Sequence, residues 1–303
     1  MSGEPESVDR ALIPLLREIN DLKRVRAAGI DGTLAARAFR RSWGRLVAGD
    51  SPVTVALRET ALAVAAARLG GIDRAMLTRA GLSGDEVTEV LQTGFDAVAG
   101  PLDPLLAATL RDHLAEPEPA AAEPPAFVHD LERQPRAGAT RPGHPRLILE
   151  PPESHADHCM ITAVSAVLAG PAFRADPAVP FLAGLSHHFH NAVLPDSGFA
   201  GEMLLGRHLE PVMTRLTKEV MATLPDHLAR ACRLALEILP NAATPEAKAF
   251  HAADVIDRVF QMDHYARAAS FELRHAVEEM ELVHAGPLQD FQTGLLRTVG
   301  LIR

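Results

Sequence analysis

The sequence predicts an all-helical protein, and three observations lead to this fold class. Alanine, leucine, arginine and glutamate abound, whereas aromatic residues make up only 4% of the 303 residues. Residues that cap helices, such as Ser83 and Thr244, stand directly before periodic segments. Apolar side chains recur at helical spacing, as in Leu12, Leu15, Leu16, Ile19 and Leu22. We therefore expect helices packed on helices.

The first 114 residues read as helices throughout. The first expected helix begins at Arg10 and ends near Gly29, because glycine commonly follows the last turn. Ser83, with Glu86 three residues later, predicts a capping box that opens another helix. Further helices are expected at about 33–48, 51–69, 73–80 and 102–114. Trp43 is expected to pack in the core, and no cluster of metal-ligating residues stands out here.

Residues 115–126, AEPEPAAAEPPA, are rich in proline, alanine and glutamate and follow no helical or strand period. They predict an extended spacer between an N-terminal helical domain, 1–114, and a C-terminal helical domain, 127–303. The C-terminal domain should hold its functional site by itself.

Two pairs of segments hint at an internal duplication. Residues 19–29 resemble 128–138, and the sequence AGLS occurs at both 80–83 and 183–186. The first domain would then be a degenerate copy of the second. Chance similarity between helices rich in alanine, leucine and arginine is the alternative.

Composition excludes several classes of function. A net charge of −9 disfavours binding of a nucleic-acid polymer through its phosphates. No segment approaches the roughly 18 unbroken apolar residues of a membrane helix, and the acidic start MSGEPESVDR does not look like a signal peptide. Cys159 and Cys232 lie far apart, which fits a reducing cytoplasm. Homo-oligomerisation stays open.

In the C-terminal part, an apolar segment predicts a buried helix that begins near Asp157. A second buried helix should begin near Pro177, and residues 194–202, LPDSGFAGE, predict a loop. In the last long helix, Asp254 lies among apolar positions and is expected to point inward, where a carboxylate needs a partner or a metal. Later helices are expected at about 209–224, 225–239 and 245–280.

The stretch GLSHHFHN, residues 184–191, places three imidazoles within four positions at the end of a predicted core helix. Neutral imidazole is the commonest protein ligand for transition metals, so this stretch indicates a metal site. An exposed loop that happens to be rich in histidine is the alternative.

PESHADHC, then GLSHH, then HAADVIDRV resemble, in this order, motifs of the HD-domain metal-dependent phosphohydrolase superfamily. DLERQPRAG, PDSG and LTKEVMATLP extend the resemblance, which is closest to the 5′-deoxynucleotidase branch and covers about Asp130 to Ala269. The resemblance implies an HD-like helical bundle. It also implies a metal-dependent hydrolase that acts on a small phosphomonoester, including a nucleotide.

Residue by residue, the resemblance places the metal ligands of the family on His158, His187, His188 and Asp254. Ligands from three separate helices can meet only at the centre of a bundle, which agrees with the buried segments that carry them. The loop aspartate of the family is kept as Asp196, the expected general acid, with His190 as a substitute.

Departures from the family pattern matter as well. His188 stands where the family has aspartate, which shifts the preference toward softer divalent ions such as Fe, Co, Ni or Zn, with Mn still a candidate. Asn191 replaces an acidic residue that assists catalysis in the nucleotidase branch, and it cannot transfer a proton. Glu202 lies where the family offers a base to phosphate, and its carboxylate would repel a nucleotide.

Two other functions remain in view. In the diiron oxygenases of the superfamily two further histidines bind metal, which would make His208 and His227 ligands. A mononuclear site is favoured, because the resemblance aligns the helix of His227 with a surface helix of the nucleotidase branch that carries no ligand. A helical module without activity is the third reading. His155 is expected either beside the ligands or exposed, and Cys159 in the core.

Overall fold

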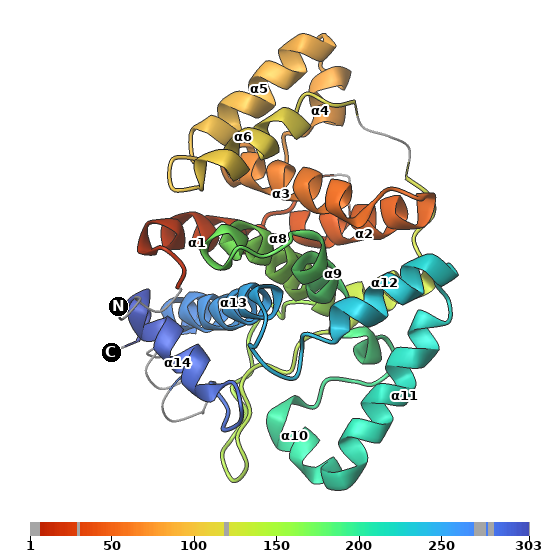
Figure 1. Cartoon of the computed structure of the whole chain (residues 1–303), viewed down its shortest axis with the longest axis vertical. Helices are drawn as coiled ribbons and strands as arrows, with labels where there is room; N and C mark the ends of the chain where they lie inside the picture. The colour runs from red at the N-terminus through yellow and green to blue at the C-terminus, as the bar shows by residue number, and fades with distance from the viewer. Residues whose placement is uncertain (1–6, 29–30, 118–120, 270–276, 278–281, 303) are drawn as a thin grey trace.

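The computed structural model describes the chain except residues 1–6, 29–30, 118–120, 270–276, 278–281 and 303 (Figure 1). Every regular element within these described ranges is a helix, and the bridges Arg26–Thr33, Pro135–Ser154 and Ala139–Leu147 are isolated pairs. The predicted all-α fold class is confirmed.

The described residues of the N-terminal part form six α-helices, and short polar side chains begin five of them. The side chains of Thr33, Ser51, Asp73, Ser83 and Asp103 each accept a hydrogen bond from a backbone N–H of the first turn. A 3-10 helix, Arg10–Leu12, leads into the first. The helices are α1 (Ile13–Asp21), α2 (Leu34–Ala48), α3 (Pro52–Leu69), α4 (Arg74–Arg79), α5 (Gly84–Asp96) and α6 (Pro104–His113).

The first helix is shorter than expected. It ends at Asp21, whereas the expected stop, Gly29, lies outside the described residues. Just after this end, the side chains of Lys23 and Arg24 form ion pairs with Glu153 in the C-terminal part. Such long-range contacts override the local helical period.

The C-terminal part is built around α8 (His155–Phe173). Figure 1 shows α8 and α9 (Ala178–Ser186) between α2 and α3 on one side and α13 (Pro245–Ala269) on the other. By length and composition α8 alone among the described helices could cross a membrane, but 89% of that stretch is buried inside the protein. The remaining helices are α7 (Ala126–Arg133), η2 (Phe189–Ala192), α10 (Gly198–Leu205), η3 (Gly206–His208), α11 (Leu209–Met221), α12 (Asp226–Leu236) and α14 (Gln289–Thr298).

Several C-terminal boundaries differ from those expected. Helix α8 begins two residues before Asp157, because Ser154 and Asp157 form a capping box. The expected loop 194–202 is wrong in its second half, where α10 begins at Gly198. This glycine adopts φ +68°, which lets the chain turn into the helix. Of the expected helix 245–280, residues 270–276 and 278–280 lie outside the described ranges.

Helices α8 and α9 approach each other closely at Gly184. A Cβ atom at this position would lie 2.5 Å from the Cα atom of Ala163. The absent side chain therefore lets the two backbones touch. This contact brings the end of α9, with its histidines, to the first turns of α8.

The two halves of the chain share one apolar core. Trp43 of α2 is fully buried, as expected, and its ring lies 5.1 Å from Phe127 and 5.4 Å from Phe189, centroid to centroid. Part of the spacer also packs on α2, where the Ala122 N–H donates to the Gly44 carbonyl at 3.1 Å. The division into two domains, with the functional site in the C-terminal one alone, stays a prediction.

The two AGLS segments have different conformations. Residues 80–83 form the turn between α4 and α5, with Gly81 at φ +96°, whereas 183–186 lie inside α9. The pair therefore adds no structural support to the idea of a duplication.

Candidate metal centre

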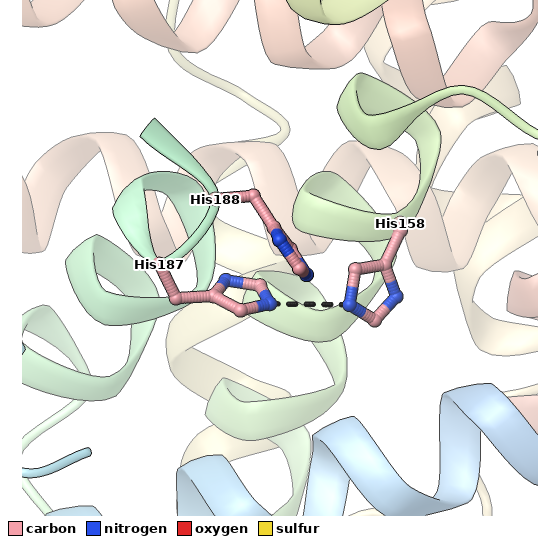
Figure 2. A group of neighbouring side chains, drawn as sticks. All are labelled: His158, His187 and His188. Carbon is pink, nitrogen blue, oxygen red and sulfur yellow. Dashed lines mark hydrogen bonds between the residues drawn. The ribbon is translucent and has the colours of Figure 1, made fainter. Parts of the chain in front are cut away.

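Three histidines meet where α8 and α9 touch. His158 lies in the second turn of α8, and His187 and His188 follow the last turn of α9. Figure 2 shows the three rings pointing toward one another from the two helices. One ligand atom of each ring lies within 4.8 Å of the others. The histidine cluster expected from the sequence is therefore a group that could hold a metal ion, with His158 buried and His187 and His188 half-buried.

The outer nitrogens of two rings face hydrogen-bond acceptors. His158 Nδ1 lies 2.6 Å from the Asp257 carboxylate, and His187 Nδ1 lies 2.8 Å from the Gly184 carbonyl. Since neither partner can donate, each Nδ1 must carry the proton of its neutral ring. Each Nε2 is then left as an unprotonated lone pair that points inward.

His188 has the same orientation. Its Nδ1 lies 2.8 Å from Oδ1 of Asn191. The amide of Asn191 is fixed because its Nδ2 donates to the Leu194 carbonyl at 3.1 Å. Oδ1 of Asn191 therefore accepts a hydrogen bond from Nδ1–H of His188, and Nε2 of His188 also keeps a lone pair.

The converging nitrogens need a shared proton or a metal ion between them. The Nε2 atoms of His158 and His187 are 3.1 Å apart and are joined by the dashed line in Figure 2, and two unprotonated nitrogens at this distance would repel each other. Metal–nitrogen bonds of about 2.1 Å place neighbouring ligands about 3.0–3.4 Å apart, which matches this spacing. Burial lowers the pKa of His187 to about 3 and that of His188 well below its usual value, so both rings are neutral.

Asp254 supplies a carboxylate from the third helix, α13. Its Oδ1 lies 3.3 Å from His158 Nε2, and its Oδ2 lies 3.6 Å from Arg258. Burial raises the pKa of Asp254, whereas the nearby guanidinium of Arg258 lowers it. Asp254 therefore points toward His158, while the group of ligand atoms within 4.8 Å of one another consists of the three histidines.

A cavity of about 270 Å³ opens beside His187, His188 and Asp254. Its wall carries two guanidinium groups, Arg136 and Arg258, and three carboxylates, Asp254, Asp196 and Glu202. Burial and the nearby charge of Asp196 raise the pKa of Glu202. The other polar groups of the wall include Thr140, Gln261 and His284.

Asp196 is anchored in this wall. Its two oxygens accept hydrogen bonds from the backbone N–H groups of Ala137, at 2.9 Å, and Gly198, at 2.8 Å. Burial opposes ionisation, but His155 and Arg136 hold the pKa of Asp196 well below its usual range. The side chain is therefore a carboxylate at rest, which makes it a poor proton donor until it has gained a proton.

His155 lies between Asp196 and the cluster. Its Nε2 is 3.4 Å from the Asp196 carboxylate, and its ring centroid is 4.6 Å from that of His188. The side chain is buried, which lowers its pKa to about 4. Of the two positions that the sequence left open, the structure places His155 beside the ligands.

His190 faces a different cavity. It lines an opening of about 410 Å³ between the end of α9, α11 and α12, which His187 also lines. Its ring centroid lies 5.7 Å from that of His188, and burial lowers its pKa to about 4. The two residues expected to move protons, Asp196 and His190, therefore reach the cluster from different sides.

Other histidines lie outside the cluster. His208 and His227, the further ligands of the oxygenase reading, are exposed, and His251 contacts the Ile238 carbonyl at 3.2 Å. Cys159 is buried, as expected. His284 stacks on Phe199 at 4.1 Å and lines the 270 Å³ cavity.

Sequence reasoning missed two charged residues of the site. Asp257 and Arg258 follow Asp254 by three and four positions on α13, so all three share one face of the helix. That spacing was visible in HAADVIDRV. It did not reveal which buried partners the two side chains would meet.

Comparison of the chain with family models, curated proteins and solved structures found no match. The HD-like character of the fold therefore stays an expectation from the motifs, and the function is argued from the site.

Proposed function

We propose that the chain is a metal-dependent hydrolase of a small phosphorylated molecule, with one divalent transition ion bound by His158, His187, His188 and Asp254. The observation that carries this proposal is the set of three imidazoles whose outer nitrogens are protonated and whose Nε2 lone pairs converge. A nitrogen-rich donor set fits Fe, Co, Ni or Zn better than Mg. When bound, such an ion lowers the pKa of water and polarises a phosphoryl oxygen.

The cavity supports a phosphorylated substrate. Arg136 and Arg258 offer guanidinium groups to an anion next to the cluster, and guanidinium matches the geometry of phosphate oxygens. Its volume, about 270 Å³, lies near the lower end of ligand sites, which are about 300–1,000 Å³, and so favours a small molecule. Glu202 in the same wall disfavours a second phosphate group near it.

The pair of Asp196 and His155 would handle the proton. Asp196 is ionised, so it can accept the proton that the attacking water loses as its oxygen bonds to phosphorus. The same group can then return that proton to the leaving oxygen as the ester bond breaks. The backbone N–H groups of Ala137 and Gly198 hold this carboxylate, and His155, neutral and buried, lies 3.4 Å from it on the side of the cluster.

A diiron oxygenase receives no support from the geometry, since His208 and His227 are exposed. A module without activity would not need four inward ligands beside a charged cavity. A cytoplasmic location and independence from nucleic-acid polymers and membranes belong to the same proposal.

Turnover of a panel of sugar phosphates and nucleoside monophosphates by metal-loaded protein tests this function. Asp196→Asn should lower the rate about 10²–10⁴-fold at equal metal content, the usual effect of losing a proton-transfer group. Asp112→Asn, at an exposed position on α6, is the matched control and should leave the rate unchanged. Inertness of the metal-loaded wild type across the whole panel would refute the hydrolase, and an undiminished rate in Asp196→Asn would remove that residue from the mechanism.

A further inference from the structure

The metal centre has a buried polar connection to the N-terminal part of the chain. Asp257 uses Oδ2 to bind His158 Nδ1, and its Oδ1 lies 2.6 Å from Lys23 Nζ and 2.8 Å from Asn20 Nδ2. The side chains of Lys23 and Asp257 are both fully buried. Asn20 lies at the end of α1, and Lys23 follows it.

Lys23 also reaches the start of α8. Its Nζ lies 3.0 Å from Glu153, which pairs with Arg24 as well. Glu153 directly precedes Ser154, the residue that caps α8. Lys23 therefore makes two contacts near His158. One is with the Asp257 carboxylate, which bonds the His158 ring, and the other is with Glu153, at the start of α8.

A third contact joins the same regions. The hydroxyl of Thr33, the residue that caps α2, donates to the carboxylate of Asp157. Asp157 is the residue before His158 and the acidic member of the capping box of α8. Side chains from the first 33 residues thus hold the backbone as well as the ring of this ligand.

Stability alone does not account for this arrangement. Removing charges from water is expensive, and a buried ion pair commonly stabilises a fold no better than well-packed apolar side chains of the same volume. A carboxylate behind a ligating histidine, in contrast, fixes the tautomer and orientation of the ring. The position of Asp257 fits this second role.

We infer that Lys23 and Asn20 are positioning residues of the metal centre, which act through the Asp257 carboxylate. They hold this carboxylate where it keeps the proton of His158 on Nδ1 and aims Nε2 at the other ligands. The N-terminal helix therefore completes the site, and the C-terminal half alone lacks part of it. This inference rests on the proposed metal centre but not on the reaction.

Metal affinity of the full chain tests the inference. The double variant Lys23→Met/Asp257→Asn removes one buried positive and one buried negative charge together, so no charge is left unpaired between these two. Its dissociation constant for Zn²⁺, measured by competition with a chelator, should rise about 10–100-fold, as for other groups behind metal ligands. The visible absorption of the Co²⁺ form should also change, because the ligand field follows the orientation of His158.

The matched control is Arg111→Met/Asp96→Asn, which removes an exposed ion pair of the N-terminal part. It should leave both the dissociation constant and the Co²⁺ spectrum unchanged. Asn20→Ala retains every charge and provides a milder variant should the double variant not fold. It should weaken Zn²⁺ binding about three- to tenfold, because it removes one hydrogen bond to the Asp257 carboxylate.

Wild-type affinity and an unaltered Co²⁺ spectrum in the folded double variant, or in Asn20→Ala if only that variant folds, would overturn the inference. A wild type that binds no metal would overturn it together with the proposed centre. A wild type that binds metal but hydrolyses no phosphate ester would remove the reaction and leave the inference standing.

Discussion

His158, His187 and His188 differ from ordinary buried histidines in where their protons lie. Each outer nitrogen faces an acceptor, namely a carboxylate, a backbone carbonyl and an amide oxygen. A buried imidazole without such a constraint can choose either tautomer to suit its neighbours. Three rings whose outer nitrogens all face acceptors could hold a metal ion, as the proposed function requires.

At this scale the sequence predicted which side chains meet but not the residues behind them. The short motifs named His158, His187, His188 and Asp254, whose side chains lie close together, and their role as ligands stays a prediction. Lys23 could not be predicted as a neighbour of Asp257, because 234 positions (257 − 23) separate them and no local pattern records a contact of that range.

Burial of neutral histidines predicts a pH-dependent stability. His155 and His190 have a pKa of about 4 in the folded protein, against about 6.5 in the unfolded chain. Between pH 6.5 and about 4 the unfolded chain therefore binds protons that the folded chain does not. The free energy of unfolding should fall with decreasing pH in this window, by up to about 1.4 kcal/mol per pH unit for each histidine, and these groups should have no effect above it.

Urea unfolding of metal-stripped protein from pH 7.5 to 4.5 measures this slope. His155→Gln should reduce this slope by the contribution of about one bound proton, because glutamine does not titrate. His208→Gln, at an exposed position, should leave it unchanged. Equal slopes in the wild type and both variants would contradict the assignment of His155 as a neutral buried group.

Among the helices, α8 and α9 carry the site because their backbones touch. The contact depends on Gly184, one turn before His187 on the same helix. Caps and apolar spacing predicted most helices to within a few residues. The predicted boundaries were wrong in two kinds of place. At Asp21 the helix ends early, where tertiary contacts begin, and at Gly198 a helix begins where a loop was expected.

Gly184→Val should push α8 and α9 apart. The added atoms would meet the backbone of Ala163, so the expected loss is about 1–3 kcal/mol in the free energy of unfolding, together with weaker metal binding. Gly294→Val is the control, because that helical glycine has open space around its Cβ position and should change stability by no more than about 0.5 kcal/mol. Chemical unfolding and Zn²⁺ titration measure both effects, and similar values for the two variants would argue against a close contact at Gly184.

For the molecule as a whole, composition was sufficient to predict an all-α fold, because helix-forming residues dominate every long segment. Composition could not predict how the two halves of the chain pack on each other. The spacer 115–126 looks like a boundary, yet Trp43 packs against both Phe127 and Phe189, and Lys23 lies against Asp257. The N-terminal helices thus belong to the surroundings of the histidine cluster and of the proposed metal centre.

The metal content of the purified protein, prepared without a histidine tag, tests the central claim most directly. Elemental analysis should find one divalent transition ion per chain in the wild type and in His208→Ala, whose exposed ring lies outside the cluster. His187→Ala and Asp254→Ala should each lose it. No metal in the wild type, two ions per chain, or full occupancy in both site variants would contradict a mononuclear centre built from His158, His187, His188 and Asp254.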